Sequence, residues 1–402
     1  MNIRSEGDKS FFEDSLKRLR EYVERENFKG YDPYDTLLSV FPFRKFGNWP
    51  AVLATQVQKR NPFQVRPLLG IKKAYNPKAI GLILQAYSRL QLIDRDSDYS
   101  DRFVYLTNWL DENQSKGFSG SSWGYNFPWA GPGKFLDAWT PTVVATGFVA
   151  QGLHAYYLYS GNSTARKLLL QSARFIIDHI PRTEFDEGVC FSYSPLFVDC
   201  CYNASLLAAE TLARAYSIEP IEQYKTLALS AVRFVVSKQH EDGHWKYKLD
   251  PKSGKERHQV DFHQGYVLDS IREIIKLTGT KENSWEAAVQ NGLEYYRHRQ
   301  FFSDGRSLWR VPIVYPVEIH NQSQGIITFS RHAREFPEYL PFAKKIAVWT
   351  IKNMQDERNG YFYYRKLKYY TNKLSFMRWS NAWMFVALTE LLSAINREGR
   401  AT

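Results

Sequence analysis

Four stretches of this chain share one outline: LDAWTPTVVATGF (136–148), VDCCYNASLLAAE (198–210), VDFHQGYVLDSIRE (260–273) and VEIHNQSQGIITF (317–329). A fifth stretch, MRWSNAWMFVALTEL (377–391), follows the same pattern. Each opens with polar or aromatic residues and continues into an apolar segment rich in small side chains. Since the openings recur at intervals of about 60 residues, the chain is predicted to repeat one supersecondary unit.

A second series of segments lies between these stretches and starts near residues 101, 163, 221, 284 and 337. Their apolar residues recur at three- and four-residue steps, with Lys, Arg and Gln on the other side. This periodicity predicts amphipathic helices that cover a core with one face. The first series has less charge, as expected of helices that are buried on all sides.

Segments rich in Gly and aromatic residues connect the second series to the first, at 120–129, 187–195, 242–250, 304–312 and 359–367. Each contains a Gly turn followed by a short, extended, aromatic stretch. The predicted unit is therefore an outer helix, an aromatic β-like turn and an inner helix.

One more inner helix is expected to start at Asn76-Pro77, because Pro suits the first helical position. Its outer partner is either 10–26 or 49–59.

About six such hairpins could form an open solenoid or a closed ring. The inner segments are apolar on all sides and neither end of the array has a polar capping repeat, which favours closure. We therefore predict an all-α fold, an (α/α)6 toroid formed by residues 1–402 as one domain. Residues 1–75 would be an irregular N-terminal portion, and 76–395 would hold the repeats.

Composition narrows the classes of partner. The chain has 402 residues and a net charge of +11, which suits an anionic glycan, an anionic membrane surface or nucleic acid. Because the basic residues are scattered, we expect no nucleic-acid partner. No apolar run of about 18 residues predicts a membrane span, and the polar N-terminus does not resemble a signal peptide, so we expect a cytoplasmic protein. The chain has only three cysteines. This small, odd number argues against a disulfide framework, so we expect the cysteines to be small buried residues.

A closed ring would bring the N-terminal ends of all inner helices, and the polar residues there, to one end of the barrel. Acids near a helix start are often caps, yet their recurrence beside His residues predicts a site. The candidate catalytic residues are Asp137, Asp199, Asp261, His263, Glu318 and His320. The candidate substrate-binding residues are Trp123, Trp139, Asn203, Trp245, Tyr266, Arg378, Trp379 and Asn381. About half of the aromatic turn residues should only pack, and the others suit sugar rings.

The openings WTPTVVATGF, VDFHQGY and MRWSNAWMF, with the intervening Gly/aromatic turns, resemble the six-hairpin glycosidase-like superfamily. The resemblance covers about residues 76–395, and RWSNAW is its most specific element. It implies an (α/α)6 fold and an activity among glycoside hydrolases, unsaturated-uronate hydrolases, uronate lyases and sugar epimerases. The resemblance does not select one member family, and fold similarity alone is a weak argument for chemistry.

Two enzymatic chemistries remain open. Hydrolysis needs two carboxyl groups that flank the glycosidic bond, and any two of the four candidate acids could serve. Proton abstraction at C5 of a uronate needs a base such as His263 or His320, with Tyr266 nearby and Arg378 on the substrate carboxylate. A toroid that binds a glycan or a protein without catalysis is the third alternative, and it predicts that the polar residues satisfy one another.

No Asp-rich isoprenoid motif, nucleotide-binding loop or zinc-protease motif is present in the sequence. We therefore expect neither a cofactor nor a metal. The favoured prediction is an enzyme that acts on an oligo- or polysaccharide, preferably one that contains uronate.

Overall fold

The computed structural model describes residues 3–131 and 134–401, and in these two stretches the chain forms thirteen α-helices and ten short strands. The inner helices are α3 (Pro77–Ile93), α5 (Val143–Ser160), α7 (Tyr202–Ile218), α9 (His263–Thr278), α11 (Ile319–His332) and α13 (Ala382–Ala401). The outer helices are α1 (Ile3–Arg25), α4 (Ser100–Glu112), α6 (Ser163–His179), α8 (Glu222–Val236), α10 (Asn283–Arg299) and α12 (Tyr339–Met354).

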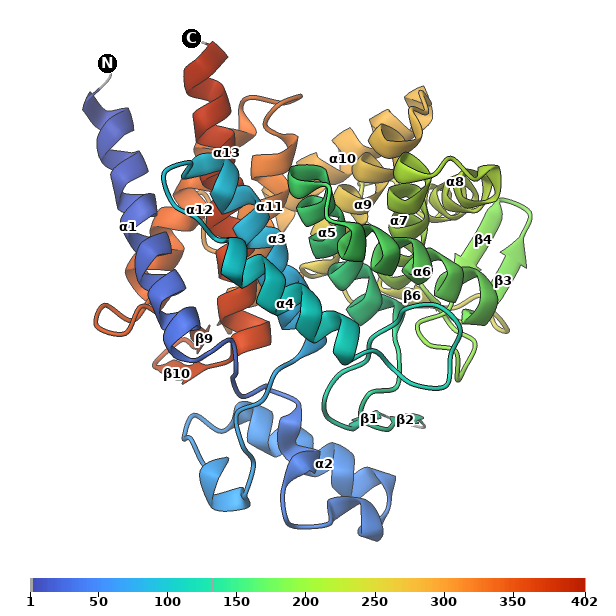
Figure 1. Ribbon diagram of the computed structural model, residues 1–402, viewed down its shortest axis with the longest axis horizontal. Coiled ribbons are helices and arrows are strands. Elements are labelled where there is room, and N and C mark those ends of the chain that lie inside the picture. The colour runs from blue at the N-terminus through green and yellow to red at the C-terminus, as the bar shows by residue number, and fades with distance from the viewer. Residues whose placement is uncertain (1–2, 132–133, 402) are drawn as a thin grey trace.

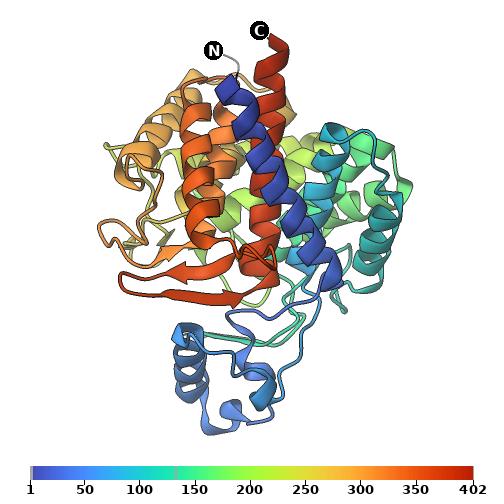
Figure 2. The same cartoon turned by 90° about the vertical axis from the view of Figure 1, so that its left-hand side faces the viewer.

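The inner helices close into a ring. Each packs on the next in chain order, from α3 through α5, α7, α9 and α11 to α13, and α13 returns to pack on α3. The first outer helix, α1, packs on α13, so the two terminal helices lie side by side (Figures 1 and 2). The predicted all-α (α/α)6 toroid is confirmed. Helix α1, and not α2 (Asn48–Arg60), is the sixth outer helix.

Burial separates the two layers in the predicted way. Every residue of α7 from Tyr202 to Ala215 is buried. In α6 the buried residues Ala165, Leu168, Leu169, Ser172, Ala173, Phe175 and Ile176 form one face. Inner helices approach each other closely where glycines meet. A Cβ on Gly81 of α3 would lie 2.6 Å from the Cα of Val149 on α5. The pair α3–α5 is therefore tightly packed because position 81 has no side chain.

Short strands connect outer to inner helices, which agrees with the predicted aromatic β-like turns. Two antiparallel hairpins are β1–β2 and β3–β4, and two three-stranded sheets have the orders β5–β6–β7 and β10–β9–β8. Strands β5 and β8 run directly into α7 and α11. The strands are β1 (Trp129–Gly131), β2 (Lys134–Leu136), β3 (Arg182–Phe185), β4 (Gly188–Phe191), β5 (Cys200–Cys201), β6 (Lys248–Leu249), β7 (Glu256–Arg257), β8 (Val317–Glu318), β9 (Tyr363–Lys366) and β10 (Thr371–Ser375).

Residues 27–75, called here the protruding segment, leave the ring between α1 and α3 and project beyond its end (Figures 1 and 2). They contain α2 and the 3-10 helices η1 (Asp35–Leu38), η2 (Phe43–Phe46) and η3 (Pro67–Leu69). A buried ion pair, Arg66 Nε to Asp35 Oδ1 at 2.7 Å, holds the segment together. Helix α2 also packs on β1, so the segment is fixed against the ring.

All three cysteines, Cys190, Cys200 and Cys201, are buried and free, as predicted. None of the helices in the described part of the chain is long and apolar enough to cross a membrane.

Candidate functional site

The N-terminal ends of the inner helices meet at the end of the ring that faces the protruding segment, while both chain termini lie at the opposite end (Figure 1). We call these the N-terminal end and the C-terminal end of the ring. At the N-terminal end, α13 is preceded by one π-helical turn, η4 (Met377–Asn381), which holds the RWSN residues of the sequence motif.

A carboxylate and an imidazole form a pair at the start of α9. Asp261 is 3% exposed, and its Oδ1 lies 2.5 Å from Nδ1 of His263. Gln259 and Arg310 contact the other oxygen, Oδ2, at 2.8 and 3.3 Å. Burial raises the pKa of Asp261, but the charges of His263 and Arg310 and the hydrogen bond from His263 outweigh it, so the pKa lies below its usual value. An ionised Asp261 accepts a hydrogen bond from Nδ1–H of His263, so in the neutral imidazole the free lone pair is on Nε2.

A second imidazole, His320 at the start of α11, is 1% exposed. Its Nε2 is hydrogen-bonded to the hydroxyl of Tyr266, and its Nδ1 has no partner among the described residues. Burial lowers the pKa of His320 well below its usual value, and Lys78 and Arg378 lower it further. Burial also raises the pKa of Tyr266 well above its usual value, so the phenol stays protonated and donates to Nε2. The neutral ring of His320 therefore carries its proton on Nδ1.

The two imidazoles contact the same aromatic ring. The ring of Phe262 is 4.2 Å from that of His263 and 4.3 Å from that of His320, between centroids. The side chain of His263 is 18% exposed, so solvent and substrate can reach this end. The arrangement places a possible base, Nε2 of His263, and a possible proton donor, Nδ1–H of His320, on two imidazoles that contact the same phenyl ring. Such a pair can remove a proton from one position of a substrate and supply one to another.

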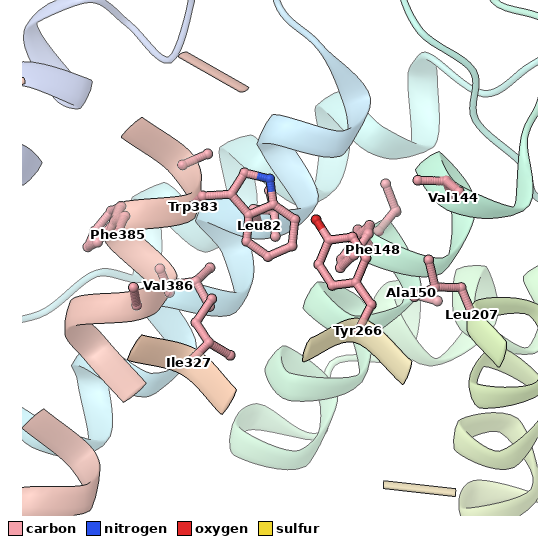
Figure 3. Packing of buried hydrophobic residues seen from close by; sticks show 14 of the residues in the cluster. Leu82, Val144, Phe148, Ala150, Leu207, Tyr266, Ile327, Trp383, Phe385 and Val386 are labelled. Atoms are coloured by element: carbon pink, nitrogen blue, oxygen red, sulfur yellow. The ribbon is translucent and has the colours of Figure 1, made fainter. Parts of the chain in front are cut away.

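A buried lysine completes the polar part of the site. Lys78 lies in the first turn of α3, is 3% exposed, and places Nζ 4.2 Å from the ring centre of Phe148 and 5.1 Å from that of Trp383. Burial holds the pKa of Lys78 well below its usual value, and the nearby charge of Arg378 lowers it further. Figure 3 shows Trp383 of α13 and Tyr266 of α9 facing each other inside the ring, with Phe148 of α5 beside Tyr266. Lys78 therefore presents its amine to the aromatic rings of Phe148 and Trp383 inside the ring of helices.

Both carboxylate oxygens of Glu318, the N-cap residue of α11, accept hydrogen bonds from side chains. Its Oε2 accepts from Nη2 and Nε of Arg365 at 2.6 and 3.0 Å, and its Oε1 accepts from Nε1 of Trp379 at 2.7 Å. The side chain is 4% exposed. A carboxylate in this setting positions Arg365 and Trp379, and it has no proton to give to a leaving group.

Several predicted site residues have partners of their own. Asp137 is exposed and pairs with Arg44 at 2.7 Å. It lies well before α5, which begins at Val143 after Thr142 caps it by accepting from the Ala145 amide. Trp139, between them, is 38% exposed with a φ of +66°. The chain turns here, so Asp137 does not share the helix-start position of Asp261 and Glu318.

Asp199 accepts from Lys134 Nζ at 2.9 Å and from the backbone amide of Tyr193 at 2.9 Å. Asn203 is buried and its Oδ1 accepts from Sγ of Cys201 at 3.1 Å. Both residues lie at the start of α7, and these contacts fix the β5–α7 connection.

Three other predicted binding residues pack inside the protein. Trp123 and Trp245 are 0% and 1% exposed, and their indole N–H groups donate to the last turns of α4 and α8, at Leu110 and Val235. Asn381 is fully buried and accepts from the backbone amide of Phe362. Their burial leaves no face for a sugar, so the expectation of substrate contact is replaced by a packing role for these three.

Arg378 was expected to bind a substrate carboxylate, but the protruding segment already supplies one. Nε and Nη2 of Arg378 donate to the two oxygens of Asp32 at 2.6 and 2.8 Å. Two other cations lie over aromatic rings at this end. Nζ of Lys59 lies 4.1 Å from the ring centre of Tyr34 and 5.6 Å from that of Trp379, and Arg310 lies 4.6 Å from that of Trp309.

Sequence reasoning missed Tyr34, Lys59, Lys78, Arg310, Arg365 and Trp383. The first two belong to the protruding segment, whose placement has no periodic signal. Lys78 had one available signal, because a charged residue right after Asn76-Pro77 interrupts an otherwise apolar helix. Among residues 3–131 and 134–401, no group of three His, Cys, Asp or Glu side chains is arranged to hold a metal ion.

The largest cavity that we identify lies at the C-terminal end of the ring and has a volume of about 930 Å³. Arg89, Arg331, Glu390 and Arg214 line it. Glu390 Oε1 accepts from Arg89 at 2.6 Å and from Arg331 at 2.7 Å, and Arg214 pairs with Glu210 at 2.6 Å. These pairs join α3, α11 and α13 and brace α7 internally, which is a structural role.

No protein-family model matches the chain, and no curated protein matches it in sequence. Solved structures do share the fold. A cellobiose 2-epimerase from Bacillus thermoamylovorans B4167 has a TM-score of 0.64 at 15% identity, over 80% of this chain and 88% of the epimerase. A sugar epimerase from a ruminal bacterium has a TM-score of 0.65 at 15% identity, over 82% and 90%. An unsaturated glucuronyl hydrolase specific for heparin has a TM-score of 0.63 at 13% identity, over 98% and 97%. At these identities the likeness establishes the fold.

Proposed function

We propose that this protein is a carbohydrate-active enzyme that transfers a proton at a sugar carbon next to a carbonyl or carboxylate group. The observation that supports it is the pair of imidazoles that contact Phe262. Asp261 fixes the proton of His263 on Nδ1, and Tyr266 fixes that of His320 on Nδ1. One imidazole is thereby a base at Nε2 and the other a donor at Nδ1.

In the proposed step, Nε2 of His263 removes the proton from the carbon, and the bonding electrons move onto the adjacent carbonyl-type oxygen. Nδ1–H of His320 hydrogen-bonds that oxygen as it becomes negative. Return of a proton to the opposite face of the carbon gives the epimer, and loss of a substituent at the neighbouring carbon gives an unsaturated sugar. Aromatic rings at this end, among them the partly buried Phe262, suit the C–H faces of a pyranose.

Hydrolysis by paired carboxylates receives less support from the same contacts. It requires one carboxylic acid with a raised pKa. The pKa of Asp261 is shifted downwards, and both oxygens of Glu318 accept from buried donors. A binding protein without catalysis would satisfy its polar groups internally, whereas Nδ1 of His320 has no partner in the described part of the chain.

A uronate is the favoured substrate within this class. Removal of C5–H requires that the negative charge of the carboxylate be neutralised, and Lys59 and Arg310 place positive charge beside the rings of Tyr34 and Trp309. The structural neighbours named as epimerases and as a glucuronyl hydrolase act, by their names, on neutral sugars and on a uronate respectively. Proton transfer next to a carbonyl-type group is the chemistry that a C2 and a C5 epimerisation have in common.

Solvent exchange tests the proposal. Oligosaccharides ending in a uronate or in a reducing aldose are incubated with the protein in D₂O and followed by proton NMR and by ultraviolet absorbance. We expect loss of the C5–H signal of the uronate, with or without an unsaturated product. Release of reducing ends with no exchange and no absorbance would show hydrolysis and refute proton transfer.

A further inference from the structure

The protruding segment has many large apolar side chains that are exposed to solvent. Its large side chains that face solvent are Leu38, Val40, Phe41, Phe46, Trp49, Leu53, Val57, Phe63 and Leu68. Single exposed apolar residues are ordinary, but a cluster of this kind within some thirty residues marks an interaction surface.

Helix α2 turns its apolar face outward. Trp49, Leu53 and Val57 follow one another at four-residue steps, so they form one stripe along the helix. Their exposed fractions are 69%, 65% and 61%. The opposite side, with the smaller residues Ala51 and Thr55, is the side buried against the protein. A helix that only needed to pack on the ring would place these two faces the other way round.

The charges around this stripe have a single sign. From residue 36 to residue 93 the sequence contains no Asp or Glu. The exposed basic residues of the protruding segment are Arg44, Lys45, Arg60, Lys72 and Lys73. Arg44 pairs with Asp137 and Lys73 with Glu26, both outside this acid-free stretch. Lys45 and Arg60 flank α2 without an acidic partner among the described residues. The surface is therefore both apolar and positively charged.

We propose that the protruding segment is a docking surface for an anionic lipid bilayer, on which α2 lies flat in the interface. An interfacial helix combines a Trp- and Leu-bearing face with flanking Lys and Arg, and its binding gains from apolar burial and from anionic headgroups together. A second copy of this chain fits less well. Symmetric pairing of this face would bring two basic surfaces together and leave their charges uncompensated.

Docking in this way would set the orientation of the ring. The segment is tied to the N-terminal end through the buried contact of Arg378 with Asp32, and it projects beyond that end (Figures 1 and 2). A bilayer bound to α2 would therefore lie on the same side of the molecule as the His263–His320 pair. This surface is independent of the proposed chemistry, because no residue of the stripe belongs to the candidate site.

The test uses the full-length protein and sedimentation with vesicles of phosphatidylcholine alone or of phosphatidylcholine mixed with phosphatidylserine. We expect binding to the mixed vesicles, at least about tenfold stronger than to the neutral ones and weakened by added salt. The combined variant Trp49→Ser, Leu53→Ser, Val57→Ser should lose this binding at least about tenfold. The charge variant Lys45→Glu, Arg60→Glu should lose the preference for phosphatidylserine.

Controls keep the outcome clear. Leu158→Ser and Tyr369→Ser remove side chains that are 67% and 86% exposed elsewhere, and these variants should bind like the parent. Failure of the parent to sediment with the mixed vesicles, or equal sedimentation of the triple variant, refutes the proposal. Dimerisation of the parent in light scattering, lost in the triple variant and without vesicle binding, would assign the face to a second copy instead. Exchange activity on a soluble oligosaccharide should be unchanged in the triple variant, so failure of the two proposals can be told apart.

Discussion

The two ends of the helical ring satisfy their buried polar side chains in different ways. At the C-terminal end the partners are charges on neighbouring inner helices. Glu390 of α13 bridges Arg89 of α3 and Arg331 of α11, and Arg214 pairs with Glu210 one turn away on α7. At the N-terminal end, Nδ1 of His320 finds no partner in the described chain, and Lys78 faces aromatic rings. The larger cavity lies at the first of these ends.

This difference shows that the size of a cavity does not by itself identify a candidate catalytic site. An acid or base needs an available lone pair or proton at a fixed place, and its protonation state must be held by neighbours. The cross-helix ion pairs that Glu390 makes at the C-terminal end stabilise the closed ring. The N-terminal end has two imidazoles with defined tautomers, and these groups are suited to react.

Removal of His263 is expected to have the largest effect on activity. His263→Ala takes away the proposed base, so the rate of C–H exchange should fall roughly 10²- to 10⁴-fold. The side chain is partly exposed, and Gln259 and Arg310 still contact Asp261 in the variant, so the melting temperature should fall less than in Glu390→Ala. Exchange rates at saturating substrate and a thermal melt measure the two effects separately.

Two carboxylates provide the matched comparison. Asp261→Asn should also lower the rate strongly, since an amide oxygen no longer fixes the proton of His263 on Nδ1 as firmly. Asp137→Asn, at an exposed ion pair, should leave rate and stability nearly unchanged. Equal rates for parent and His263→Ala would end the assignment of this end of the ring as the site.

The C-terminal end should respond in the opposite manner. Glu390→Ala leaves Arg89 and Arg331 without the carboxylate that joins them, and breaking a buried pair of this kind costs about 3–5 kcal/mol. We expect a much lower free energy of unfolding in urea, with unchanged exchange activity per folded molecule. The control Glu335→Ala breaks an ion pair with Arg272 in which the Glu335 side chain is 50% exposed. The free energy of unfolding should fall by less than about 1 kcal/mol in this variant. Lost activity in folded Glu390→Ala would contradict this division of roles.

Much of the fold was predictable because it follows from periodicity. The spacing of about 60 residues indicates the repeating unit. The two helix types differ in sequence because the inner helices are buried on all sides and the outer helices on one face. Closure was predictable from the lack of capping repeats. The protruding segment was not, since its short 3-10 turns and α2 are held by specific contacts such as Arg66 with Asp35, which have no sequence period.

The candidate site was predictable where the helix starts are regular. VDFHQGY and VEIHNQ place His263 and His320 at equivalent positions of neighbouring helices, with Tyr266 one turn after His263, and the structure brings these three together. Asp137 shows where the same reasoning stops. Pro141 and the positive φ of Trp139 delay the start of α5, so an acid that aligns in sequence lies at the surface in space. Partners that come from the protruding segment, such as Asp32 on Arg378, could not be foreseen from the repeats.

The smallest of the predicted effects is a pH dependence of stability that arises at the C-terminal end. His154 of α5 is 2% exposed, and its Nδ1 contacts Nη1 of Arg214 at 2.7 Å. Burial lowers its pKa to about 3, and the charge of Arg214 acts in the same direction. Its ordinary value is 6.5, so the unfolded chain binds a proton here before the folded chain does. Stability from this group is fully present above about pH 6.5 and is lost as the pH falls towards 3.

Between pH 7 and pH 5 the loss due to His154 should be about 2 kcal/mol. His154→Gln keeps an acceptor for Arg214 but cannot take up a proton, so its free energy of unfolding should fall by that much less over the same interval. Urea titrations at the two pH values measure it, and His258→Gln, at an exposed histidine, should match the parent slope. An unaltered slope in His154→Gln would mean that this imidazole is protonated in the folded protein. The ion-pair network at the C-terminal end would then be open to protons, and the contrast between the two ends of the ring would be weaker than the contacts indicate.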